Sequence, residues 1–158
     1  MTDHRIATRS RVHEAAQEGG PIKLLVQEAD EVARRFEFLA SRIPYRAVAP
    51  KVVKHTVADL SRALAGATWK RVSEEVPSYR FAEDLGRRYR DTGASLTSLL
   101  LHWQILRRAI HLVLADHDVR TGEGALPILQ EMTLMNYAID WATEASLVGY
   151  VLPASVEG

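Results

Sequence analysis

The sequence predicts an all-α protein, a single-domain helical bundle of five or six helices. Apolar residues recur at steps of three and four along most of the chain, which is the period of a helix that packs on one side. No segment shows the period-two alternation of a half-buried strand. The chain has 158 residues, 47% of them hydrophobic and 25% charged, which suffices for one core.

The clearest stripe lies in 22–43, and Pro44 ends that helix. Pro50 suits the first position of the next helix, and Gly66 and Gly93 are natural stops. In order, the predicted helices cover residues 22–43, 50–65, a short turn near Trp69, 78–91, 95–117 and 126–152. Residues 21–152 form the predicted domain, preceded by a flexible or partner-docking segment, 1–20, and followed by a tail, 153–158.

The helix that begins after Ser95, a plausible N-cap, is central because it is apolar on two sides. Its main stripe consists of Leu96, Leu99, Trp103, Leu106, Ile110, Val113 and Leu114. Its second stripe consists of Leu101, Ile105 and Leu112. The last helix also has two apolar sides, the second of which holds Leu134, Tyr137, Trp141 and Val148.

Each of the two long helices has a second apolar stripe that must be buried. Other helices of this chain or a second subunit could bury it. The second possibility predicts a homodimer that forms through the last two long helices. The residues predicted for this interface are Leu101, Ile105, Arg108, Leu112, Leu134 and Val148.

The sequence lacks the motifs of a catalytic site, so the chain is not expected to be an enzyme. There is no nucleophile elbow and no glycine-rich phosphate loop. His102, His111 and His117 share one helix, but no two of them are one turn apart, so no metal site is expected. Haem needs one axial histidine, and a globin-like haem-binding or other small-ligand-binding sensor is the alternative function. His117 is the candidate haem ligand.

Two adjacent arginines, Arg107 and Arg108, lie close to the apolar stripes of the central helix. The favoured interpretation pairs them with Asp140 or Glu144 of the facing helix. The alternative is an anionic ligand held between the two helices. The residues that would bind it are Trp103, Arg107, Tyr137 and Trp141.

The composition of the chain limits which classes of partner and which cellular compartment are expected. Twenty basic and 20 acidic residues cancel without a clustered basic patch, so nucleic-acid binding is not expected. No apolar run reaches the roughly 18 residues of a membrane span, and the polar N-terminus is not a secretory signal. The chain has no cysteine, which fits a reducing compartment, and a cytoplasmic location is expected.

The run Gly86-Arg-Arg-Tyr-Arg-Asp-Thr-Gly93, followed by Ser95-Leu96, Leu99-Leu100, Trp103, Leu106-Arg107-Arg108 and Ile110, resembles a known family. It is similar to the N-terminal sensor domains of RsbR-type stressosome proteins and of certain bacterial sensor histidine kinases, the RsbRD N-terminal family. The stretch Met135–Glu144 is similar to that family's last helix, so the resemblance covers roughly residues 50–150.

This resemblance implies a helical, dimeric, non-catalytic input domain of a bacterial signalling protein involved in stress responses. Such a domain passes helix shifts to a downstream effector, for example a kinase. This chain departs from the pattern because it stops at Gly158. It is therefore expected to be a fragment of a longer protein or a stand-alone copy that acts through a partner protein.

Overall fold

The computed structural model describes residues 28–43, 54–60, 79–121 and 125–152, and side chains in these ranges except 118–131. It contains α3 (Ala29–Ala40), α6 (Arg80–Asp91), α7 (Leu96–Thr121), α8 (Ala125–Val151) and a helical stretch at 54–60. These residues include no strand, so the all-α prediction is confirmed. The predictions for 1–20, for the turn near Trp69 and for 153–158 lie outside the described residues.

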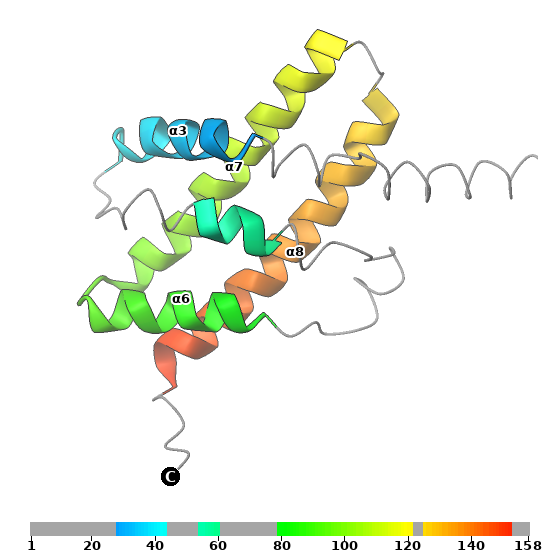
Figure 1. The fold of residues 1–158 in the computed structure, drawn as a ribbon. Helices are drawn as coiled ribbons and strands as arrows, with labels where there is room; N and C mark the ends of the chain where they lie inside the picture. Colours follow the sequence, from blue (N-terminus) through cyan, green and yellow to red (C-terminus); the bar gives the residue numbers. More distant parts are fainter. Residues whose placement is uncertain (1–27, 44–53, 61–78, 122–124, 153–158) are drawn as a thin grey trace, which may run out of the picture.

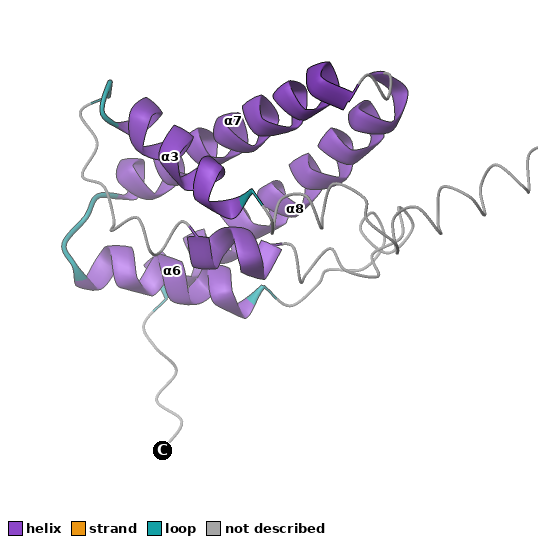
Figure 2. Ribbon diagram, turned by 45° about the horizontal axis from the view of Figure 1, so that its top comes forward, coloured by secondary structure: helices purple, strands orange, loops and turns teal. Residues whose placement is uncertain are grey.

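The two long helices, α7 and α8, form an antiparallel hairpin around which the shorter helices are arranged (Figure 1). Helix α3 packs across α7, and α6 packs across α8. Figure 2, tilted from the first view, shows α3 and α6 on the same side of the hairpin. The core lies between these short helices and the hairpin, so one side of α7 and α8 faces away from it. None of the described helices is long and apolar enough to cross a membrane.

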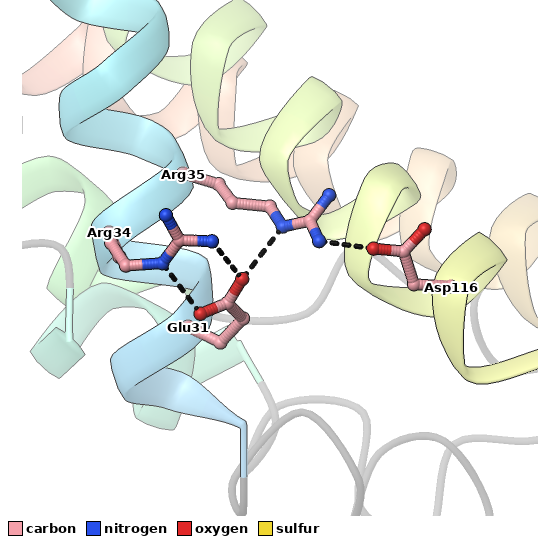
Figure 3. A network of polar contacts seen from close by, with 4 residues as sticks. All are labelled: Glu31, Arg34, Arg35 and Asp116. Atoms are coloured by element: carbon pink, nitrogen blue, oxygen red, sulfur yellow. Dashed lines mark hydrogen bonds and ion pairs between the residues drawn. The ribbon is translucent and has the colours of Figure 1, made fainter. Parts of the chain in front are cut away.

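Helix α3 follows the predicted stripe, because Val32, Ala33, Phe36 and Ala40 are buried. Its polar side forms an ion-pair network with α7 (Figure 3). Glu31 accepts hydrogen bonds from Arg34, at 2.6 and 2.8 Å, and from Arg35, at 2.9 Å. Arg35 also pairs with Asp116 of α7. The Arg34 and Arg35 guanidinium groups lower the pKa of Glu31 to about 2. The network therefore links α3 to α7 through Arg35 and Asp116.

Helix α6 crosses α8 at backbone contact, which two glycines permit. A Cβ atom added to Gly86 would lie 1.9 Å from the carbonyl oxygen of Ser146. A Cβ atom added to Gly149 would lie 2.0 Å from the carbonyl oxygen of Glu83. Any side chain at either position would force the two backbones apart. The buried residues of α6 are Ala82, Leu85, Gly86 and Tyr89.

The turn between α6 and α7 forms as the sequence predicts. Gly93 adopts φ +73°, the left-handed conformation that glycine reaches at least cost. The amide of Ala94 donates to the Tyr89 carbonyl and the amide of Gly93 to that of Arg90, as in a Schellman motif. Ser95 then caps α7, because its Oγ accepts the amide hydrogen of Ser98 at 3.1 Å.

The main stripe of α7 forms the centre of the core. Leu99, Trp103, Leu106, Ile110, Val113 and Leu114 are all buried. Leu96 differs from the prediction, since it is 39% exposed at the first position of the helix. Ile43, predicted to extend the α3 stripe, is also exposed because α3 ends at Ala40.

Candidate functional site

Three contacts hold α7 and α8 in register. The indole Nε1 of Trp103 donates to Ser146 Oγ at 2.8 Å. Arg107 forms an ion pair with Asp140, and a hydrogen bond of 3.0 Å joins His111 to Asn136. Residues 103, 107 and 111 of α7 therefore lie level with 146, 140 and 136 of α8. The predicted pairing of Arg107 with Asp140 is confirmed.

A cluster of aromatic rings around His102 joins three helices. A hydrogen bond of 2.9 Å connects His102 Nδ1 to the hydroxyl of Tyr89 on α6. The His102 ring lies 5.1 Å from the Phe36 ring on α3 and 5.5 Å from the neighbouring Trp103 ring, measured between centroids. Through its bond to Ser146, Trp103 extends the cluster to α8. One buried group of side chains thus fixes the four helices relative to one another.

Burial lowers the pKa of His102 from 6.5 to about 3, because the enclosed ring is poorly solvated when charged. His102 is not among the functional residues predicted from the sequence, and in the structure it is a central packing residue. The sequence signal that indicates burial of His102 is its helical position, next to Trp103 and one turn before Leu106. The partner hydroxyl of Tyr89 was not visible in the sequence, since the two helices pack only in the folded chain.

The low pKa of His102 predicts that acid destabilises the fold. The unfolded chain binds a proton between pH 6.5 and about 3 that the folded chain excludes, so stability is full above pH 6.5 and falls as the pH falls through this window. The slope reaches at most about 1.4 kcal/mol per pH unit. Urea unfolding at pH 7, 6 and 5 measures it. Glu31 does not contribute between pH 7 and pH 5, because its contribution is lost only below pH 4.5.

His102→Gln removes the titrating group but keeps a partner for Tyr89, so we expect a shallower slope. His55→Gln makes the same substitution at an exposed position and is the control variant. Burial also lowers the pKa of His111, so a smaller slope of the same sign remains in His102→Gln. Equal slopes in His102→Gln and the native chain would contradict the assignment.

The four residues predicted to bind a ligand are not brought into one site. Trp103 is fully buried in the core, and Arg107 is paired with Asp140. Tyr137 is exposed on the surface of α8, and Trp141 is half-buried one turn further along. The indole of Trp103 donates to Ser146 of α8 inside the core, whereas Tyr137 lies on the surface.

The residues predicted for the dimer interface are mostly on the surface. Arg108, Leu112 and Val148 are exposed, and Leu101 and Leu134 are half-buried. Ile105 differs, since it is only 4% exposed and belongs to the core of this chain. It lies one turn after His102, on the side of α7 where α3 packs, and offers almost no surface to a partner.

We define the outer face of the hairpin as the surface of α7 and α8 opposite α3 and α6 (Figures 1 and 2). Its α7 residues are Leu101, Gln104, Arg108 and Leu112, and its α8 residues are Tyr137, Glu144 and Val148. Leu112, Tyr137 and Val148 are 38%, 39% and 46% exposed. Large apolar side chains exposed together on two long helices are typical of a protein contact surface.

In the part of the chain that the structure describes, the remaining histidines do not form a metal-binding cluster. His117 is half-buried near the end of α7. No group of three or more histidine, aspartate or glutamate side chains among the described residues is placed to hold a metal ion. The haem alternative stays a prediction.

The outer face is therefore the candidate functional site, supported from the other side by the buried His102 cluster. No protein-family model matches the chain, and no curated protein or solved structure matches it either.

Proposed function

We propose that the protein is a non-catalytic regulatory or sensory input domain that works as a homodimer joined through the outer face of the α7–α8 hairpin. The observation that carries this proposal is the exposure of Leu112, Tyr137 and Val148 on that face. The resemblance to the sensor domains of RsbR-type proteins and sensor histidine kinases supports it independently.

The physical reason for a dimer is the amount of apolar surface that the single chain leaves in water. Removing apolar surface from water stabilises an assembly by about 25 cal/mol per Å². Two hairpins packed face to face form a four-helix bundle, in which each long helix has a covered apolar stripe on both sides. A second copy supplies such a hairpin without any further protein.

The proposed mechanism is a small shift of helices at the dimer interface, which is a common way to transmit a signal. Helix α8 is suited to this role because it contacts α6 through Gly149 and α7 through Ser146, and it also carries part of the outer face. A change in the packing of α3 or α6 would therefore alter the outer face. The signal would pass to a downstream domain or a partner protein.

Leu112→Glu tests the dimer. A carboxylate at this position would lose its hydration at the interface, so we expect the dissociation constant of the dimer to rise about 100-fold, equivalent to roughly 3 kcal/mol. The native chain should have twice the mass of one chain in light scattering, and the variant should be a monomer at the same concentration.

Leu96→Glu is the matched control. Leu96 is a leucine on the same helix with 39% exposure, but it lies about 160° around the helix from Leu112. A carboxylate at the start of a helix interacts favourably with the helix dipole, so this variant should fold and stay a dimer. A native chain that is monomeric at high concentration would overturn the proposal.

Signalling is tested by fusing a dimerisation-dependent DNA-binding reporter after Leu152. The native chain should activate the reporter, and Leu112→Glu should not. Tyr89→Phe removes the hydrogen bond to His102 without touching the outer face. We expect Tyr89→Phe to change the reporter output while the mass of the dimer stays the same. If the reporter output changes only when the mass of the dimer changes, the domain dimerises but does not transmit a signal.

A further inference from the structure

We propose that the two copies align in parallel, with α7 of one copy against α8 of the other, and that Arg108 and Glu144 select this alignment by pairing between copies. This inference rests on the proposed homodimer and adds its geometry and the residues that determine it. Both α8 C-termini would then leave the dimer at the same end.

The two helices of the outer face repeat one pattern with opposite charge. On α7, an arginine and a leucine follow Leu101 at seven and eleven positions, namely Arg108 and Leu112. On α8, a glutamate and a valine follow Tyr137 at the same seven and eleven positions, namely Glu144 and Val148. Eleven residues span about 16 Å and return to within about 20° of the same side of a helix. Each helix therefore presents two apolar residues with one charge between them.

Both charges are available to a partner. Arg108 and Glu144 are exposed, and neither forms an ion pair with another residue in the described ranges. The neighbouring Arg107 and Asp140, by contrast, pair with each other inside the chain. The outer face thus keeps one positive and one negative side chain, one on each helix, that form no ion pair with the residues the structure describes.

The register of the hairpin shows which residues a parallel partner would meet. Because residues 103 and 146 lie level, Leu101 lies level with Val148. Because residues 111 and 136 lie level in antiparallel helices, Leu112 lies level with residue 135, about 3 Å along α8 from the level of Tyr137. A two-fold axis parallel to the hairpin places α7 on the partner's α8 at unchanged height, so each leucine meets an apolar residue. Arg108 and the partner's Glu144 are then separated by about one helical turn, a distance that an arginine side chain spans.

The antiparallel alignment gives the opposite electrostatics. A two-fold axis across the hairpin places α7 on α7 and α8 on α8, and Leu101 then meets Leu112 of the other copy. Arg108 would lie within about one turn of its own copy in the partner, and so would Glu144. Like charges placed together at an interface are destabilising, so the charges favour the parallel alignment.

Charge substitution tests the pairing. Arg108→Glu and Glu144→Arg each place like charges together in the parallel dimer, and we expect each variant to weaken dimerisation about 30-fold. The double variant Arg108→Glu/Glu144→Arg should restore most of the affinity, because every cross pair is again of opposite charge. An equimolar mixture of the two single variants should form a heterodimer, in which both cross pairs are complementary. In the antiparallel dimer, each single variant keeps two like-charge contacts, so neither would weaken it.

Cysteine cross-linking tests the alignment directly, because the chain contains no cysteine of its own. Leu112→Cys mixed with Tyr137→Cys should form a disulfide-linked heterodimer under mild oxidation. Leu101→Cys mixed with Leu112→Cys is the matched pair for the antiparallel dimer and should remain uncross-linked. All three positions lie on the outer face, so the pairs differ only in alignment.

The two levels of the proposal fail in different ways. A native chain that is monomeric in light scattering overturns the homodimer and this inference together. A native dimer that cross-links through the Leu101→Cys and Leu112→Cys pair, or that both charge variants leave unchanged, overturns only the parallel alignment. A dimer with a restored double variant and a cross-link between positions 112 and 137 supports both.

Discussion

Gly86→Ala should destabilise the protein by about 3 kcal/mol or more, as measured by urea unfolding. The added methyl group would lie 1.9 Å from the Ser146 carbonyl oxygen, and a second backbone atom, the Tyr150 nitrogen, lies 2.9 Å away. Backbone atoms inside a helix cannot rotate out of the way as a side chain can. The two helices must therefore separate, which opens the core along the whole crossing. Gly149→Ala should have a similar effect because its Cβ would meet the Glu83 backbone.

Gly93→Ala is the control that separates crowding from backbone conformation. Gly93 has a positive φ, but a Cβ at this position would meet nothing within 4 Å. Alanine there should cost only about 1 kcal/mol, the usual penalty for the left-handed conformation. If Gly86→Ala costs no more than Gly93→Ala, the close crossing of α6 and α8 is wrong.

Trp103→Ala should destabilise the protein by about 3–5 kcal/mol, because it empties a fully buried site at the centre of the core. The truncation also removes the hydrogen bond to Ser146 and the ring contact to His102. Since these contacts join α7 to α8 and to the aromatic cluster, we expect the unfolding transition to move as a whole. Urea unfolding followed by circular dichroism measures the change.

Trp141→Ala serves as the comparison, because Trp141 is the same residue type in a half-buried position on α8. Its loss should cost clearly less than that of Trp103. Trp103→Phe retains much of the ring packing but lacks the indole N–H, so it should cost about 1–2 kcal/mol through the lost hydrogen bond. Equal costs for the two alanine variants would contradict the placement of Trp103 at the centre of the core.

The helices were predictable because their signals are local. Glycine at 93, serine at 95 and apolar residues at steps of three and four act within a few residues. Helices α6 and α8 begin and end within about two residues of the predicted positions, and α7 begins within one residue but continues four residues past its predicted end at 117. Ile43 was placed wrongly because a stripe does not record where the helix ends.

The candidate site was only partly predictable. The second apolar stripes and the pairing of Arg107 follow from helical period and charge, and Leu112 and Val148 are exposed as that interpretation requires. Ile105 was misplaced because period alone assigns a side of the helix but does not say which neighbour covers it. Ile105 lies at the edge of its stripe, where the helical period does not distinguish core from surface, and it is 4% exposed in the structure.

The sequence by itself determined that the protein is helical, where α6 and α8 begin and end to within about two residues, and that its two longest helices are apolar on two sides. Only the tertiary structure decided which of those sides is covered, because burial depends on residues that are distant in sequence. Tyr89 and His102 become partners, and Gly86 becomes a contact point with α8, only when α6 crosses the hairpin. The register of α7 against α8 also comes from this packing, and it places Arg108 and Glu144 where a second copy would bring them together.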